Sequence, residues 1–262
     1  MGLSATLPGV RGLVVVGALA GCGQVAAPAD DAPPDADLGA LLNGCALLEH
    51  MDEPAWSGVA GEVKDACGDD DNGTALGGVT TVDGGVRGRA GNFDGNGCIE
   101  LGDAASLHAS TGLTISAWVN PSGLNAIDAN GIVSKRIDTG IDASYSVYIW
   151  TGDKVWVDLD GENDRFPGTR TISNGAWSQI TVVYDGTDII QQRVHVFVDG
   201  SLDITSGESS ASLPPLTAPP HVGCLPSSQA VQNFKGLIDE VAIWTRPLSG
   251  AEVAAWYEMT RP

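Results

Sequence analysis

The stretch LTISAWVN, residues Leu113–Asn120, decides the fold class of this chain. Its apolar residues Leu113, Ile115, Ala117 and Val119 are separated by single residues. Successive side chains of a β-strand point to opposite faces, so these four side chains share one face. The alternation predicts an antiparallel strand with one buried face.

The same period-2 pattern recurs further along the chain. It appears in residues 144–150, 154–160, 177–184 and 193–199. Asp-Gly dipeptides predict turns between such segments, and Asp199-Gly200 predicts a tight hairpin, because this dipeptide tolerates the positive φ of a type I′ turn. Only the C-terminus is helical in pattern, with Ser249 and Glu252 spaced as a capping box. We therefore predict an all-β fold, a two-sheet antiparallel jelly-roll sandwich with a short C-terminal helix.

The N-terminus is typical of a targeting segment. Its apolar run, residues 13–20, is shorter than the ~20 residues that span a bilayer and has the length of a signal-peptide core. The run ends in Leu-Ala-Gly-Cys22, which resembles the lipobox of bacterial lipoproteins. We predict a lipoprotein signal peptide over 1–21 and lipid attachment at Cys22. The protein would then be exported and held on a membrane.

Two further segments follow Cys22. Residues 22–40 are rich in Pro, Ala and Asp, which predicts a flexible tether between the lipid and the domain. Gly23 after the modified Cys favours the outer membrane and cell surface over the inner membrane. Residues 41–262 are predicted to form one jelly-roll domain, since all-β domains of this length are common.

The charge balance excludes one class of partner. The chain has 33 acidic and 13 basic side chains and a net charge of −20. Nucleic-acid binding needs a basic face that contacts phosphates, so we expect no nucleic-acid partner. The surplus carboxylates are suited instead to cations.

Four cysteines remain after Cys22, namely Cys45, Cys67, Cys98 and Cys224. An even number in an exported protein predicts two disulfides, and the count alone leaves three pairings open. No Cys-x-x-Cys spacing occurs, which disfavours a zinc site.

Several short motifs resemble those of the laminin G-like, concanavalin A-like jelly rolls of bacterial surface proteins. The resemblance covers roughly residues 45–258 and rests on the motifs at 65–74, 88–95, 114–119, 177–186, 196–200 and 234–252. It implies the jelly-roll fold. A single motif of this kind is weak, but six in the same order are specific to the fold. The fold does not by itself predict the function, because one fold can carry many activities. The function has to be inferred from a site.

The resemblance also implies a structural calcium ion. Many members of the family hold calcium between an N-terminal Asp loop and the strand with the sequence Ile-Asp-Glu-Val. Here this implies Asp65, Asn72 and Asp239 as ligands, which offer the oxygen atoms that calcium prefers. In the family fold Cys67 and Cys98 lie near this region, so the resemblance favours the pairs Cys67–Cys98 and Cys45–Cys224. The alternative is a solvated acidic turn without metal.

A ligand site is predicted on two neighbouring strands. Tyr148, Trp150 and Trp156 take outward positions in the alternation, and aromatic faces stack on sugar rings. Arg136 and Asp158 would orient the sugar hydroxyls. The alternative is that these aromatic side chains belong to a core. We predict a carbohydrate-binding or adhesive module for glycans or surface proteins, and a structural or protein-interaction domain is the alternative.

A hydrolase is the third hypothesis. Asp158, Asp160 and Glu162 resemble the paired carboxylates of jelly-roll glycoside hydrolases, which act as nucleophile and acid. Asp158 is shorter than the nucleophilic Glu of those enzymes, and Asp160-Gly161 predicts a turn that would take Glu162 off the strand. We therefore predict that the chain is not an enzyme.

Overall fold

The computed structural model describes residues 38–67, 71–124, 128–138, 143–161, 165–227 and 232–262. All of them belong to the compact unit Ala36–Pro262. The predicted signal peptide, Cys22 and most of the predicted tether lie outside the described residues. No helix in the described part of the chain is long and apolar enough to cross a bilayer.

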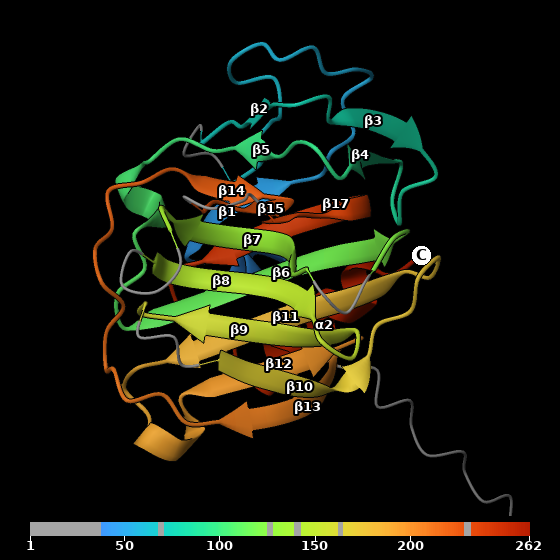
Figure 1. The fold of residues 1–262 in the computed structure, drawn as a ribbon. Coiled ribbons are helices and arrows are strands. Elements are labelled where there is room, and N and C mark those ends of the chain that lie inside the picture. The colour runs from blue at the N-terminus through green and yellow to red at the C-terminus, as the bar shows by residue number, and fades with distance from the viewer. Residues whose placement is uncertain (1–37, 68–70, 125–127, 139–142, 162–164, 228–231) are drawn as a thin grey trace, which may run out of the picture. The chain divides into compact units, whose positions relative to one another are not determined.

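Two antiparallel sheets form the domain (Figure 1). The strands of the back sheet are β1 (Cys45–Glu49), β3 (Thr80–Asp83), β4 (Arg89–Asp94), β6 (Gly112–Pro121), β11 (Ser178–Asp185), β12 (Val194–Val198), β13 (Ser201–Ser206) and β17 (Lys235–Trp244). Those of the front sheet are β2 (Thr74–Ala75), β5 (Ile99–Glu100), β7 (Asn130–Arg136), β8 (Ala143–Trp150), β9 (Lys154–Leu159), β10 (Arg165–Thr171) and β14 (Pro220–Val222).

The order of the back sheet is β13-β12-β11-β6-β17-β4-β3, with β1 also paired to β17. The order of the front sheet is β10-β9-β8-β7-β14-β5-β2. A small third sheet joins β15 (Cys224–Leu225) to β16 (Gln232–Asn233). Neighbours in these sheets are often far apart in sequence, as the adjacent β6 and β17 show. The two packed sheets confirm the predicted all-β sandwich.

The core lies between the two sheets and contains the predicted inward faces. Leu113, Ile115, Ala117 and Val119 of β6 are all buried in it. So are the inward side chains of β8 and β9, namely Val147, Ile149, Val155, Val157 and Leu159. The predicted hairpin is also present, since Asp199 and Gly200 have φ of 50° and 67° between β12 and β13. Alternation therefore identified the strands because one face of each is covered by the other sheet.

Strand β17 departs from simple alternation. Ile238 and Ile243 both enter the core although they are five positions apart, an odd spacing that simple alternation places on opposite faces. The register between β17 and β6 shifts between Asp239 and Ala242, and Glu240 has a φ of 48°. A β-bulge of this kind adds one residue to a strand and reverses the faces beyond it. The bulge therefore lets both isoleucines face inward.

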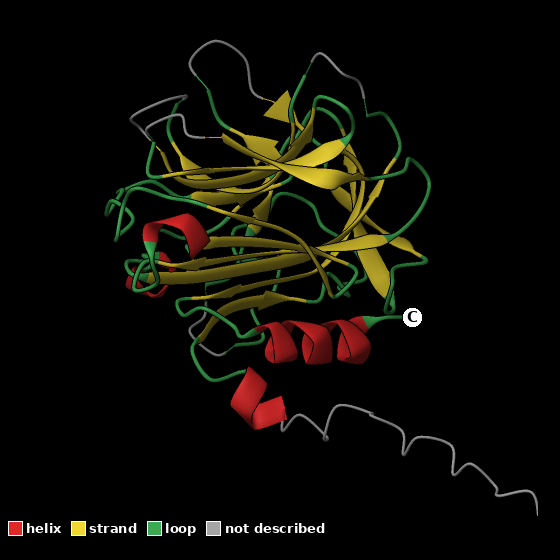
Figure 2. Cartoon of the chain, turned by 90° about the horizontal axis from the view of Figure 1, so that it is seen from below, coloured by secondary structure: helices red, strands yellow, loops and turns green. Residues whose placement is uncertain are grey.

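Helix α2 (Gly250–Thr260) lies on the outer face of the back sheet (Figure 2). Ser249 and Glu252 form the predicted capping box. The helix buries Val253 and Trp256 against Trp244 of β17, and the two indole rings meet edge to face at 5.2 Å. The short helix α1 (Leu38–Leu41) begins within the last residues of the predicted tether. Leu41 is buried there, and its carbonyl accepts a hydrogen bond from Nε1 of Trp244.

The disulfides pair differently from the prediction. The bonds are Cys45–Cys67 and Cys98–Cys224, with Cα–Cα distances of 5.9 and 5.6 Å. The predicted pairs Cys67–Cys98 and Cys45–Cys224 are therefore wrong. The sheet pairings give the reason. Asp65 bridges Glu49 of β1, so the following loop runs back to Cys45, and β5 pairs with β14, which brings Cys98 to Cys224.

Candidate functional site

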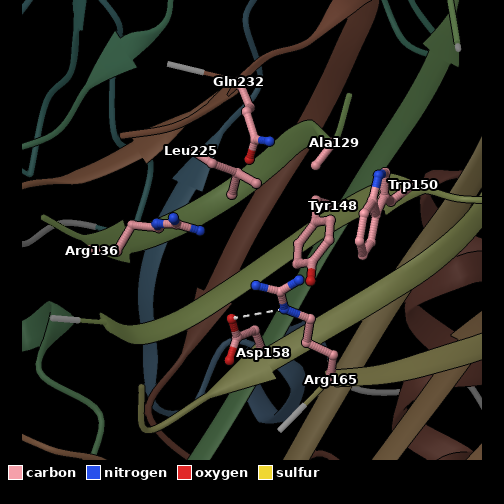
Figure 3. Close-up of a pocket in the computed structure, with 8 residues that line it drawn as sticks. All are labelled: Ala129, Arg136, Tyr148, Trp150, Asp158, Arg165, Leu225 and Gln232. Atoms are coloured by element: carbon pink, nitrogen blue, oxygen red, sulfur yellow. Dashed lines mark ion pairs between the residues drawn. The ribbon is translucent and has the colours of Figure 1, made fainter. Parts of the chain in front are cut away.

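A cluster of aromatic and charged side chains lies on the outer face of the front sheet. Tyr148 of β8 is opposite Trp156 of β9, and Asp158 of β9 is opposite Arg165 of β10. Because side chains alternate along each strand, residues 148, 150, 156 and 158 all share this outer face. Arg136, at the end of β7, reaches the same cluster (Figure 3).

These side chains surround a cavity of about 70 Å³. We call it the sheet-face pocket, and its lining consists of Ala129, Arg136, Tyr148, Trp150, Asp158, Arg165, Leu225 and Gln232. Four of the five predicted ligand-binding residues line it. The fifth, Trp156, packs against Trp150 with ring centroids 5.2 Å apart. The structure therefore brings all five predicted residues together.

The aromatic residues differ in exposure. Trp150 and Trp156 are partly exposed, whereas Tyr148 is only 3% exposed. Tyr148 belongs to a small apolar cluster with Ala129 and Leu225, which covers it from the side of β15. The predicted exposure of Tyr148 is therefore wrong. The alternative of a core position fits Tyr148, whose buried cluster lies on the outer face of the sheet, whereas Trp150 and Trp156 are partly exposed against it.

The segment that carries Leu225 approaches the sheet very closely. A Cβ atom at Gly131 of β7 would lie 2.4 Å from the carbonyl carbon of Cys224. Cys224 is held to Cys98, and Ser134 of β7 donates a hydrogen bond of 2.8 Å to its carbonyl oxygen. Gly131 therefore allows β15 to lie on β7 and to close one side of the pocket.

Three charged groups dominate the electrostatics of the pocket. The Nε atom of Arg165 lies 3.9 Å from a carboxylate oxygen of Asp158, and its guanidinium lies 5.5 Å from the ring centre of Trp150. Burial lowers the pKa of Arg136, although nearby Asp158 opposes this change. Burial also raises the pKa of Tyr148, so its hydroxyl keeps its proton at neutral pH. The pocket can thus offer hydrogen-bond donors to a polar ligand beside an aromatic surface.

Arg165, Leu225 and Gln232 were missed by sequence reasoning. Arg165 follows Asp158 across the hairpin from β9 to β10, so a predicted pairing of these strands could have found it. Leu225 and Gln232 come from β15 and β16, many residues later in the chain. Alternation within a strand carries no signal for contacts of that separation.

The acidic residues of the hydrolase hypothesis are not arranged along one strand. Asp158 lies on β9, which ends at Leu159. Asp160 follows in a turn with a φ of 55°, and its carboxylate accepts a hydrogen bond from the Ser210 hydroxyl. The predicted turn at Asp160-Gly161 is confirmed. Glu162 lies outside the described residues.

Two of the predicted calcium ligands meet. The amide N–H of Asp65 donates to Oδ1 of Asn72 at 3.0 Å. The Asp65 carboxylate accepts hydrogen bonds from the main chain of Leu48 at 3.0 Å and of Cys67 at 2.8 Å. Asp65 therefore orders its own loop and fixes the loop against β1.

Asp239 has other contacts. Its carboxylate accepts hydrogen bonds from the main-chain N–H groups of Arg87 at 3.2 Å and Glu240 at 2.9 Å. Burial raises the pKa of Asp239 to about 7. Among the described residues, no three His, Cys, Asp or Glu side chains are grouped so as to hold a metal. Asp65 and Asn72 are thus joined by a hydrogen bond, whereas the hydrogen bonds described for Asp239 go to the main chain of Arg87 and Glu240.

Glu49 is a better candidate than Asp239 for a ligand of a cation. It bridges Asp65 in the backbone pairing and is fully buried. Neither of its carboxylate oxygens has a hydrogen-bond partner among the described residues. Burial and the charges of Glu53 and Asp65 raise its pKa well above the ordinary value. A buried carboxylate without a partner is costly, and a cation would remove that cost.

Comparison with known proteins identifies the fold family. The model of the Laminin_G_3 family, described as the concanavalin A-like lectin/glucanases superfamily, matches residues 93–254, more than half of the chain. No curated protein sequence matches the chain.

Solved structures with this fold include domain 4 of AbnA, a GH43 extracellular arabinanase from Geobacillus stearothermophilus, in complex with arabinotriose. The TM-score is 0.59 at 21% identity, over 80% of this chain and 96% of that domain. The binding domain of Paraclostridial Mosquitocidal Protein 1 has a TM-score of 0.62 at 18% identity, over 84% of this chain and 53% of that one. The botulinum neurotoxin serotype G binding domain has a TM-score of 0.59 at 15% identity, over 82% of this chain and 51% of that one. This chain thus spans about half the length of these two binding domains.

The prediction that the chain is not an enzyme needs correction. The AbnA domain is part of an arabinanase, so a jelly roll that looks like a binding module can belong to a glycoside hydrolase. At sequence identities of 15–21%, the similarity to these structures shows the fold alone. The family match over more than half of the chain shows that the chain belongs to the concanavalin A-like lectin/glucanases superfamily.

Proposed function

We propose that this chain is a cell-surface lipoprotein whose jelly-roll domain binds glycans at the sheet-face pocket. The convergence of Trp150 and Trp156 with Arg136, Asp158 and Arg165 on one outer sheet face carries the proposal. Sugar sites combine aromatic surfaces with a few placed polar groups, and both are present here. The family description includes lectins, and the AbnA domain was solved with a bound arabinose oligomer, which supports the same reading.

Attachment at Cys22 is the second part of the proposal. It rests on the Leu-Ala-Gly-Cys sequence after a short apolar run. Acyl chains on Cys22 would hold the protein on a membrane, because each buried CH₂ contributes about 0.8 kcal/mol. Incorporation of labelled fatty acid into the wild-type chain, but not into Cys22→Ala, tests this attachment.

A glycan array probed with the full chain, in detergent and with calcium, tests the glycan site. We expect binding to one class of glycan. Replacing Trp150 or Trp156 by Ala should weaken that binding about tenfold or more, which corresponds to about 1.4 kcal/mol. Leu202→Ala is the control, since Leu202 is 52% exposed on β13 of the other sheet.

Two results would contradict the glycan site. One is the absence of binding by a folded sample, and the other is unchanged binding by both Trp variants. The first result would favour a protein partner. A botulinum neurotoxin binding domain of this fold, solved with rat synaptotagmin II, motivates that alternative at 11% identity. Calcium beside Asp65 and Glu49 is proposed as a structural ion, and its test is described below.

A further inference from the structure

Arg136 is a buried cation that forms no ion pair with the residues that the structure describes. Its side chain is 4% exposed, although it belongs to the outer face of the front sheet. Its Nε and Nη2 atoms have no hydrogen-bond partner in the described part of the chain. The guanidinium points into the space between Leu225, Tyr148 and Asp158 (Figure 3). A buried donor without a hydrogen-bond partner destabilises the fold, so a ligand that accepts hydrogen bonds from these donors would be stabilised.

The nearby carboxylates have other contacts. Asp158 forms its ion pair with Arg165, and Arg136 forms none within the residues that the structure describes. Asp138, whose charge also reaches Arg136, lies 3.3 Å from the Ser227 hydroxyl, which donates to it. Among the described residues, the lining of the pocket thus contains two guanidiniums and one carboxylate. That balance suits a ligand with one negative charge.

The shape of the pocket favours a carboxylate. The cavity of about 70 Å³ admits a planar group of a few heavy atoms beside the Arg136 guanidinium. The free Nε and Nη2 of a guanidinium match the two oxygens of a carboxylate in a planar, bidentate pair. Trp150 lines the same pocket beyond Tyr148 and Arg165 (Figure 3), where the ring that carries the carboxylate could pack.

We infer that the sheet-face pocket selects acidic glycans, with a sugar carboxylate bound by Arg136 and its ring beside Trp150. This inference rests on the proposed glycan-binding function and names the class of sugar. The chain carries a net charge of −20, which repels polyanions at long range. We therefore expect glycans with isolated acidic sugars to bind better than polyuronates.

Calorimetric titration of the full chain with matched pairs of sugars tests the inference. The probes are 3′-sialyllactose against lactose, and glucuronic acid-substituted xylotriose against xylotriose. At least one acidic member should bind tenfold or more tightly than its neutral partner. Arg136→Met should abolish that preference, and Arg136→Lys should retain only part of it, because an ammonium cannot form the bidentate pair.

Arg261→Met is the control for the loss of charge. Arg261 is 53% exposed at the C-terminus, where it pairs with Glu258, and its removal should leave the preference unchanged. Arg136→Met should also melt no lower than the wild type, because it removes a buried charge without an ion-pair partner. A lower affinity in a stable variant therefore reports on the ligand.

The outcomes separate the two proposals. Equal binding of acidic and neutral partners, or an unchanged preference in Arg136→Met, would overturn the acidic class and leave glycan binding intact. No binding of any of the four probes would also overturn the acidic class. In that case the glycan array decides the proposed function independently.

Discussion

Gly131 shows how one residue shapes the pocket. Its missing side chain lets β15 lie on β7, where a Cβ would be 2.4 Å from the Cys224 carbonyl carbon. Gly131→Ala should lower the free energy of unfolding by about 1–3 kcal/mol, as overpacking does, and should weaken glycan binding by displacing Leu225. Thermal melts and array binding measure the two effects. Gly102→Ala is the control, since a Cβ there meets nothing within 4 Å; equal effects of both changes would contradict this role.

At the residue scale, the sequence predicted the members of the site better than their environments. Alternation placed Tyr148, Trp150, Trp156 and Asp158 on one face, because that property depends only on strand geometry. The burial of Tyr148 could not be predicted, because Leu225 covers it from a segment distant in sequence. Arg165 was missed for a related reason, since its position depends on the pairing of β9 with β10.

At the element scale, the disulfide Cys98–Cys224 should stabilise the fold more than Cys45–Cys67. The bonds join residues 126 and 22 positions apart, for which loop entropy predicts stabilisation of about 5 and about 3 kcal/mol. Urea unfolding of the two double Cys→Ala variants should show the larger loss without Cys98–Cys224. That variant should also bind glycans more weakly, because Cys224 holds β15 beside the pocket. Equal losses would contradict the entropic argument.

Elements were predicted where their own sequence determines them. The strands β6, β8, β9, β11 and β12 and the capped helix α2 carry complete local signals. The disulfide pairs were wrong because they depend on which strands become neighbours. The bulge in β17 was likewise not predicted, although the five-residue spacing of Ile238 and Ile243 is a signal for it.

At the scale of the whole molecule, the excess of acidic residues continues into the interior. Glu49 and Asp239 are both fully buried, and burial raises the pKa of each. Buried carboxylates that lack a cationic partner reduce stability when they ionise. Asp239 is at least held by two main-chain N–H groups, whereas Glu49 has no partner among the described residues. The domain therefore gains most if a cation binds at Glu49.

Removal of divalent cations should consequently lower the melting temperature of the full chain. If calcium binds Glu49 beside Asp65, it stabilises the native state in proportion to the logarithm of its free concentration. Excess chelator should lower the melting temperature, and added calcium should restore it. Glu49→Gln should remove this response to calcium, because it removes the buried charge. Asp239→Asn is the control and should leave the response in place, since the main chain of Arg87 and Glu240 holds Asp239. A melt that is unchanged by chelator would show that Glu49 is instead buried as the neutral acid.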